Sequence, residues 1–312
     1  MDMTDQKLIN EFAAHAKAEG LCVNYAQIHR NGELTAEYSR LPSKTRLNVW
    51  SVSKGVVSCA AGIALEEGLI SLDERICDIF PEYVPADPGP FLPKITIRHL
   101  LTMTSGLAEP LFMGDSEEKY TVKDWIAYFF NARFDKEPGT GWIYSNFHTY
   151  MVSCAIERRA GMNLLEYLRP RLFDKIGIGN PEWTLCPMGH VYAANGLYLT
   201  IDELSSFGEM VTNYGEYRGI RVVPEAYLRE ATKKLADNSS HATPENDSFQ
   251  GKGYGYQFIQ NPGNRSWRSE GNYGQFCVMI PEKKAVVTVM SLDGNYNRIG
   301  TLLWQDVIGR IE

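Results

Sequence analysis

Ser51 and Lys54 are the two residues of this sequence whose types and spacing best fit covalent catalysis. They stand three positions apart in Ser51-Val52-Ser53-Lys54, where an apolar segment of helical character begins. Residues i and i+3 of a helix lie on the same side of it, so the two side chains can meet. A lysine desolvated in a pocket loses its proton more easily and can serve as a base for a neighbouring serine. The pair predicts acyl transfer through a covalent intermediate on Ser51.

The Ser-x-x-Lys spacing is weak evidence alone, because two common residue types meet at this spacing by chance. Ser116 and Lys119 show the same spacing within a charged stretch that opens no apolar helix. That copy is interpreted as a solvated surface segment. For Ser51 taken alone, the alternative is a serine that caps a helix.

A second arrangement follows the turn at Pro138-Gly139. Tyr144 is the only tyrosine in the sequence with an asparagine, Asn146, two positions later. A phenol near a lysine can transfer a proton, and an amide can bind a substrate carbonyl or hold the lysine in place. The alternative is a core tyrosine followed by a turn asparagine.

The composition limits the classes of protein to which the chain can belong. It has 312 residues, 44% hydrophobic and 22% charged, which is ordinary for a globular protein. A net charge of −7 argues against nucleic acid or an anionic membrane as a partner. The six cysteines contain no C-x-x-C pair and the six histidines no metal-ligand spacing, so neither metal nor cofactor is expected. No export signal and no long apolar run is visible, which predicts a cytoplasmic protein without a membrane span.

Residue periodicity places strands at both ends of the chain and helices between them. This pattern predicts an α+β protein whose single antiparallel sheet is assembled from both termini, with a mostly helical insertion. The expected elements are a helix over 4–19, a hairpin turning at Asn31-Gly32, a helix over 51–67, helices near 122–132, 147–160, 163–175 and 201–213, a polar loop over 236–253, strands over 254–259, 276–280 and 285–290, and a closing helix over 297–311.

Ser51-x-x-Lys54 and Tyr144-x-Asn146 together resemble the motifs of the class C β-lactamase-like serine hydrolases. This group includes penicillin-binding D-amino-acid peptidases, carboxylesterases and nylon-oligomer hydrolases. Stretches 68–74, 96–107 and 195–204 agree in order and spacing, although Met103 stands where the family usually has histidine. The resemblance covers about residues 20–310. It implies a β-lactamase/transpeptidase-like fold in one catalytic unit (1–312), with an α/β part over about 1–66 and 195–312 and a helical part over about 67–194.

The resemblance also implies roles for individual residues. Ser51 would be the nucleophile, Lys54 and Tyr144 would share general acid/base work, and Asn146 would contact the acyl side of the substrate. The backbone N–H groups of Ser51 and Asn272 would form the oxyanion hole.

The third family motif departs from the usual pattern. Where the family has Lys-Thr-Gly or His-x-Gly on a strand lining the site, this chain has Ser269-Glu270-Gly271. Gly271 fits because the substrate must approach the backbone closely there. Ser269 would contact substrate but supplies no positive charge for a carboxylate, and Glu270 would repel one if it faced the site.

These departures favour cleavage of a neutral ester or amide through an acyl-enzyme. The first alternative is a penicillin-binding D-amino-acid peptidase or a class C-type β-lactamase, and the second is a catalytically silent ligand-binding homologue. The expected partner is a small ester, amide or short peptide, with no nucleic acid or membrane. A homo-oligomer is left open.

Overall fold

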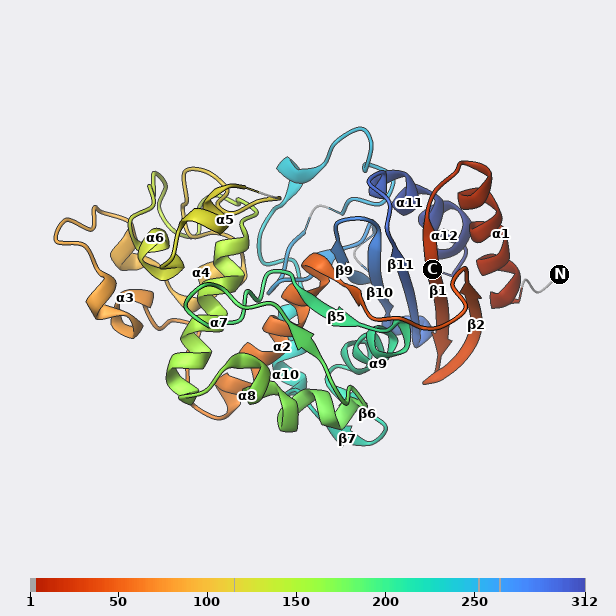
Figure 1. Cartoon of the computed structure of the whole chain (residues 1–312), viewed down its shortest axis with the longest axis horizontal. Coiled ribbons are helices and arrows are strands. Elements are labelled where there is room, and N and C mark those ends of the chain that lie inside the picture. The colour runs from red at the N-terminus through yellow and green to blue at the C-terminus, as the bar shows by residue number, and fades with distance from the viewer. Residues whose placement is uncertain (1–3, 115, 252, 264, 312) are drawn as a thin grey trace.

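The computed structural model describes residues 4–114, 116–251, 253–263 and 265–311. Helices pack against both faces of an antiparallel sheet, with a largely helical region to one side (Figure 1). The predicted α+β class, with an antiparallel sheet flanked by helices, is confirmed. The first helix, α1 (Asp5–Ala18), buries the apolar stripe expected over 4–19, which consists of Leu8, Ile9, Phe12, Ala13 and Ala16.

The main sheet joins the two ends of the chain. Its strand order is β2-β1-β11-β10-β9-β8, and neighbouring strands are antiparallel. Ile28 on β1 lies opposite Val287 on β11, so the first strand pairs with the last, as predicted. Both chain ends lie at the sheet side of the molecule (Figure 1). The strands are β1 (Val23–Arg30), β2 (Glu33–Ser39), β8 (Ile259–Gln260), β9 (Trp267–Gly271), β10 (Gln275–Ile280) and β11 (Ala285–Ser291).

The predicted hairpin between β1 and β2 is present. Asn31 and Gly32 adopt φ angles of 53° and 81°, the left-handed conformations of a two-residue hairpin turn. The strand predicted over 254–259 is wrong for most of its length, since β8 begins at Ile259. Gly255 lies so close to helix α10 (Glu225–Ala231) that a Cβ there would stand 1.9 Å from the Ala231 carbonyl oxygen. Packing against α10 therefore overrides the strand-like pattern of this segment.

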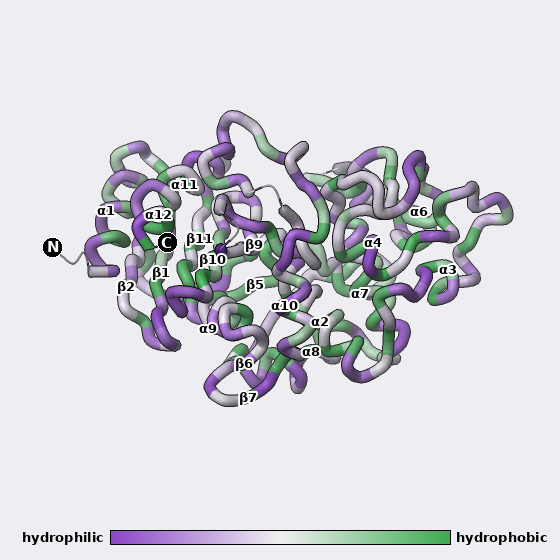
Figure 2. The backbone as a smooth tube through the Cα atoms, turned by 180° about the vertical axis from the view of Figure 1, so that it is seen from behind, coloured by the Kyte–Doolittle hydropathy of each residue, from purple (hydrophilic) through white to green (hydrophobic). Residues whose placement is uncertain are grey.

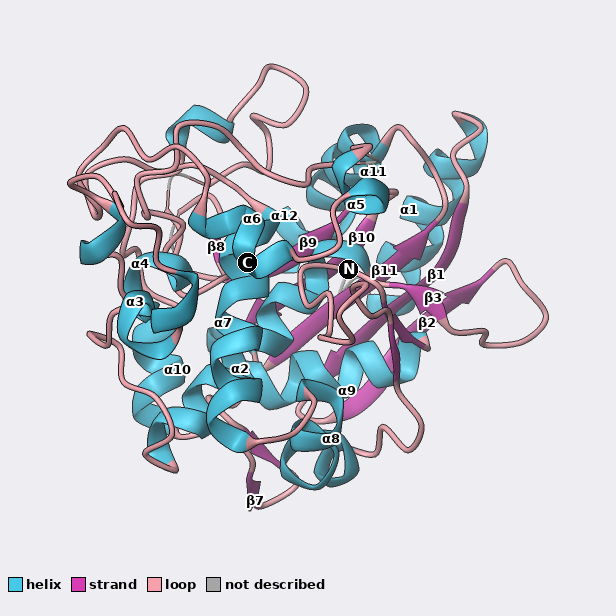
Figure 3. Ribbon diagram, turned by 60° about the vertical axis from the view of Figure 1, so that its left-hand side comes forward, coloured by secondary structure: helices cyan, strands magenta, loops and turns pink. Residues whose placement is uncertain are grey.

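Two apolar cores cover the two faces of the sheet. Helices α1, α11 (Tyr296–Leu303) and α12 (Gly309–Ile311) share one core with Val278 and Val287. Helices α2 (Ser53–Glu66) and α9 (Ile201–Thr212) share the other core with Met279 and Val286. Figure 3 shows α2 and α9 in front of the strands. The predicted closing helix is confirmed, with a π-helical turn at Trp304–Ile308 between α11 and α12.

The middle of the chain is mostly helical, as expected. Its helices are α3 (Ile76–Ile79), α4 (Ile97–Leu101), α5 (Glu118–Thr121), α6 (Trp125–Phe130), α7 (Asn146–Ala160) and α8 (Leu164–Leu168). Helix α7 is buried from Asn146 to Glu157 and packs on α2. Figure 2 shows hydrophobic segments, in green, near both helices. This packing brings the starts of α2 and α7, with their motif residues, to one place.

Short strands complete the structure. β3 (Leu47–Asn48), β5 (Leu197–Leu199) and β4 (Glu182–Trp183) form a small sheet, and β6 (Glu216–Tyr217) pairs with β7 (Ile220–Arg221). The small sheet connects the segment before Ser51 to the segment after Asn195. Within the described ranges, no helix is long and apolar enough to cross a membrane.

Candidate active site

Ser51 lies in a tight turn that leads into α2. The turn is a 3-10 helix over Trp50–Val52, so the α-helix begins at Ser53, two residues later than predicted. Trp50 adopts a φ of 50°, which is uncommon for a residue with a side chain and costs energy. Its N–H donates to Asn48 Oδ1 at 2.8 Å, and its carbonyl accepts from the Ser53 hydroxyl at 2.8 Å. Neighbouring residues therefore hold the backbone on both sides of Ser51.

Lys54 is buried directly behind Ser51. Its side-chain nitrogen lies 2.8 Å from Ser51 Oγ, 2.9 Å from Asn146 Oδ1 and 2.8 Å from the Ala194 carbonyl oxygen. No carboxylate of the described residues pairs with it. Burial, together with the charge of Lys119, holds the pKa of Lys54 well below its ordinary value of 10.5.

The three oxygens around Lys54 determine what each hydrogen of its amine can do. Asn146 Oδ1 and the Ala194 carbonyl only accept hydrogen bonds, because the Asn146 amide nitrogen donates to the Phe112 carbonyl at 2.7 Å. A neutral amine has two N–H groups, and these two acceptors use both of them. Its lone pair then faces Ser51 Oγ, and the serine hydroxyl donates to it. This is the geometry of a base beside a nucleophile.

Tyr144 stands beside both Lys54 and Ser51, just before α7. Lys54 Nζ lies 4.9 Å from the centre of the phenol ring. Burial raises the pKa of Tyr144 above its ordinary value, and a hydrogen bond with Ser51 acts in the opposite direction. The environment therefore favours a neutral lysine and a protonated tyrosine at the same pH.

Gly271 and Asn272 bring the end of β9 against the serine turn. A Cβ on Gly271 would stand 2.5 Å from the Val49 carbonyl oxygen and 2.9 Å from the Ser51 nitrogen. Glycine is required there because a side chain would push the strand away from Ser51. Asn272 lines the same cavity as Ser51.

The other two residues of this motif lie on opposite sides of the strand. The space beside Gly55 on α2 holds Ser269 Oγ, which is buried and accepts or donates no hydrogen bond in the described structure. The cavity contains Glu270 instead of Ser269. The predicted substrate contact of Ser269 is therefore not supported by its position, because strand alternation turns this side chain toward α2.

A cavity of about 150 Å³ opens at Ser51. Of the predicted residues, it is lined by Ser51, Tyr144, Asn146, Gly271 and Asn272. Eight further residues line the cavity and were not among the predicted site residues: Trp50, Met113, Gly114, Asn195, His241, Ile259, Glu270 and Tyr296.

Asn195 opens one of the stretches that resemble the family, whereas no motif points to Met113, His241 or Tyr296. His241 comes from the loop over 236–253 and stacks on the Tyr144 ring, with the ring centres 5.5 Å apart. Only the path of this loop in the fold reveals that it covers the site.

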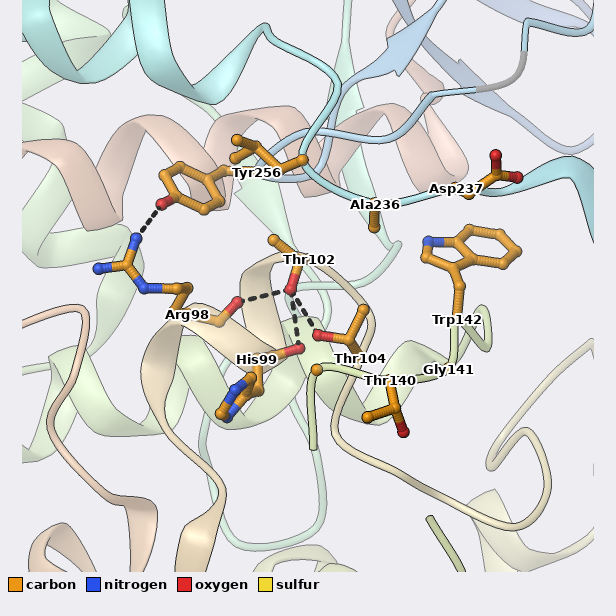
Figure 4. A pocket seen from close by; sticks show the side chains of 12 residues that line it. Arg98, His99, Thr102, Thr104, Thr140, Gly141, Trp142, Ala236, Asp237 and Tyr256 are labelled. Carbon is orange, nitrogen blue, oxygen red and sulfur yellow. Dashed lines mark hydrogen bonds between the residues drawn. The ribbon is translucent and has the colours of Figure 1, made fainter. Parts of the chain in front are cut away.

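A larger cavity of about 430 Å³ lies next to this site (Figure 4). The Trp142 ring lines it, and the same ring packs against Tyr144 at 6.1 Å between centres. Its polar groups bond mainly to one another: Arg98 donates to the Tyr256 hydroxyl, and the Thr102 hydroxyl bonds to the Arg98 carbonyl. Among its described residues there is no serine or cysteine, so size alone does not identify the reactive cavity.

In the described part of the chain, no group of three or more His, Cys, Asp or Glu residues could hold a metal ion. All six cysteines are free thiols. His148, next to the tyrosine motif, is fully buried and contacts Ser105 Oγ at 2.6 Å, so it packs within the fold.

Comparison with known proteins identifies the family. A model of the beta-lactamase family matches residues 7–306, and the chain belongs to this family. It is 31% identical to the lovastatin esterase of Penicillium rubens over 160 residues, covering 43% of this chain and 38% of that protein. It is 27% identical to penicillin-binding protein 4* of Bacillus subtilis over 219 residues, covering 64% of this chain and 45% of that protein. The chain thus spans less than half the length of these relatives.

Solved structures agree on the fold. The octameric penicillin-binding protein homologue from Pyrococcus abyssi superimposes with a TM-score of 0.76, at 20% identity, over 99% of this chain and 78% of that one.

Proposed function

We propose that this protein is a serine hydrolase that cleaves an ester or amide through an acyl-enzyme on Ser51. The observation that carries the proposal is the 2.8 Å contact between Ser51 Oγ and the buried Lys54 amine, whose two N–H groups are used by other acceptors. The family membership and the name of the lovastatin esterase support the same class of reaction. The substrate is a small ester, amide or short peptide.

Acylation follows from the protonation states that the site favours. Ser51 Oγ attacks the substrate carbonyl and its proton passes to Lys54 Nζ. The bond to the leaving alcohol or amine breaks as Tyr144 gives its proton to the departing atom. A proton then moves from Lys54 to the Tyr144 phenolate, which returns both groups to their starting states.

Deacylation repeats the sequence with water. Water attacks the acyl carbonyl and gives a proton to Lys54, and Ser51 Oγ leaves with the proton of Tyr144. The backbone N–H groups of Ser51 and Asn272 stabilise the oxyanion in both steps, and such donors are worth a factor of about 10² to 10³ in rate. Gly271 supports this role because it lets β9 approach Ser51.

The test is the turnover of p-nitrophenyl acetate by Ser51→Ala. We expect turnover to vanish while the circular dichroism spectrum stays unchanged, and a fluorophosphonate probe to label wild-type Ser51. Ser116→Ala is the matched control, because it alters the other Ser-x-x-Lys copy. Undiminished turnover by Ser51→Ala would refute the proposal.

Nitrocefin and a fluorescent penicillin separate the alternatives. Rapid nitrocefin hydrolysis or stable penicillin labelling at Ser51 would assign the chain to the β-lactamase or peptidase class. Absence of probe labelling would indicate a silent homologue.

A further inference from the structure

The wall of the Ser51 cavity contains the carboxylate side chain of Glu270. Among the described residues that line this cavity, Glu270 is the one with an acidic or basic side chain other than His241. Burial lowers the pKa of His241 below its ordinary value of 6.5, so this ring is neutral at neutral pH. A ligand entering the cavity therefore meets a carboxylate.

A buried arginine explains how this carboxylate is held. Arg268 Nε donates to Glu270 Oε2 at 2.6 Å, and the side chains are 0% and 16% exposed. The other guanidinium nitrogens donate to the Phe249 carbonyl at 3.1 Å, Asn261 Oδ1 at 3.0 Å and Gln250 Oε1 at 3.0 Å. Arg268 is absent from the cavity lining, so the pair presents its acidic partner to a ligand.

Aromatic rings surround the same space. Trp50, Tyr144, His241 and Tyr296 line the cavity, and Tyr273 packs on Trp50 with ring centres 5.0 Å apart. The faces of tryptophan and tyrosine rings attract cations, most strongly where water is excluded. A carboxylate set among such rings is chemically suited to an ammonium group.

The position of Glu270 indicates which part of the substrate this group belongs to. Glu270, Tyr144 and Tyr296 all line the same cavity of about 150 Å³. Glu270 therefore shares this small space with Tyr144, the proposed proton donor to the leaving atom, and its charge raises the pKa of both phenols. The alcohol or amine released in acylation departs on this side.

We propose that the cavity selects esters or amides whose leaving group carries an ammonium ion, with Glu270 as its anionic contact. The inference rests on the proposed hydrolysis at Ser51 and names the substrate class for that reaction. The ammonium lies against the Glu270 carboxylate and the neighbouring aromatic rings. Substrates with a carboxylate at the same place are repelled.

Acetylcholine and 3,3-dimethylbutyl acetate provide a matched pair of probes. They have the same acyl group and nearly the same shape, and differ by a quaternary nitrogen in place of a carbon. We expect wild-type kcat/KM to favour acetylcholine by about tenfold or more, which corresponds to about 1.4 kcal/mol. In Glu270→Gln the ratio should fall close to one, since the amide keeps an acceptor for Arg268 but lacks the charge.

Glu282→Gln is the control for charge at a distance. It makes the same chemical change at an exposed turn residue, and the wild-type ratio should persist. A wild-type ratio near one, an unchanged ratio in Glu270→Gln, or cleavage of neither probe would overturn the inference. Turnover of p-nitrophenyl acetate by the same preparations separates the two proposals, because its presence sustains hydrolysis at Ser51 even when the ammonium preference fails.

Discussion

The backbone at Gly271 lies so close to the backbone of Ser51 that no side chain fits between them. A Cβ on Gly271 would lie 2.9 Å from the Ser51 nitrogen, closer than side-chain carbons normally approach another atom. The distance links a strand near residue 270 to the turn at residue 51. It also means that the backbone around the nucleophile tolerates no added atom on this side.

Gly271→Ala should therefore damage catalysis more than stability. We expect kcat/KM for p-nitrophenyl acetate to fall about 10²-fold, the scale of one oxyanion donor, and stability to fall by about 1–3 kcal/mol from overpacking. Gly179→Ala is the control, because a Cβ there meets nothing within 4 Å. Equal activity of the two variants would show that the close approach has no catalytic role.

The lowered pKa of Lys54 predicts the pH dependence. A neutral Lys54 is the reactive form, so kcat/KM should rise with pH and level off well below 10.5. The raised pKa of Tyr144 keeps the phenol protonated throughout this range, so no fall is expected on the alkaline side below pH 10. Rates corrected for spontaneous ester hydrolysis measure the profile.

Lys119 offers a way to move that profile. Its charge contributes to the lowered pKa of Lys54, so Lys119→Met should shift the rising limb to higher pH. Lys123→Met removes a nearby lysine that has no such effect in the structure, and it should leave the limb in place. If neither substitution shifts the rising limb of the pH profile, a group other than Lys54 controls the pH dependence.

Tyr144→Phe tests the proton donor. We expect kcat to fall at least about 10²-fold, the lower range for general acid/base catalysis, with little change in KM. Tyr256→Phe removes a phenol from the neighbouring cavity and serves as the control. A rate like that of wild type would remove Tyr144 from the mechanism.

Ser269→Ala distinguishes the structure from the family pattern. Ser269 Oγ faces Gly55, is buried and has no partner among the described residues. Removing it should leave kcat/KM within about threefold and should not lower the melting temperature, because an unpaired buried hydroxyl costs free energy. A large rise in KM would instead restore Ser269 as a substrate contact.

The sequence was sufficient for the parts of the fold and site that depend on local pattern. The Asn31-Gly32 turn and the apolar runs of β10 and β11 follow from residue type and spacing alone. The chemistry of the Asn146 amide suggested that it could hold Lys54 in place, and the structure puts Asn146 Oδ1 2.9 Å from Lys54 Nζ.

The remaining features depend on long-range packing. The strand predicted around Gly255 is absent because this segment packs closely against α10. Nothing within the segment itself indicates this contact. His241 and Tyr296 reach the cavity from a loop and a helix end that carry no recognisable motif. Strand alternation predicts that the side chains of Ser269 and Glu270 point to opposite faces of β9. Which of the two faces the cavity at Ser51 depends on how β9 packs against α2, and the sequence does not show this.

The pairing of β1 with β11 has a consequence for the folding of the chain during its synthesis on the ribosome. Ser51, Lys54 and Tyr144 are all synthesised within the first half of the chain. Gly271 and β11, the strand that pairs with β1, are synthesised near the end. At about 5–20 residues per second, more than a hundred residues separate these events by at least several seconds. A growing chain thus carries the proposed nucleophile, Ser51, long before Gly271 and Asn272 can complete the proposed oxyanion hole, and hydrolysis should begin only after the last strands have been synthesised.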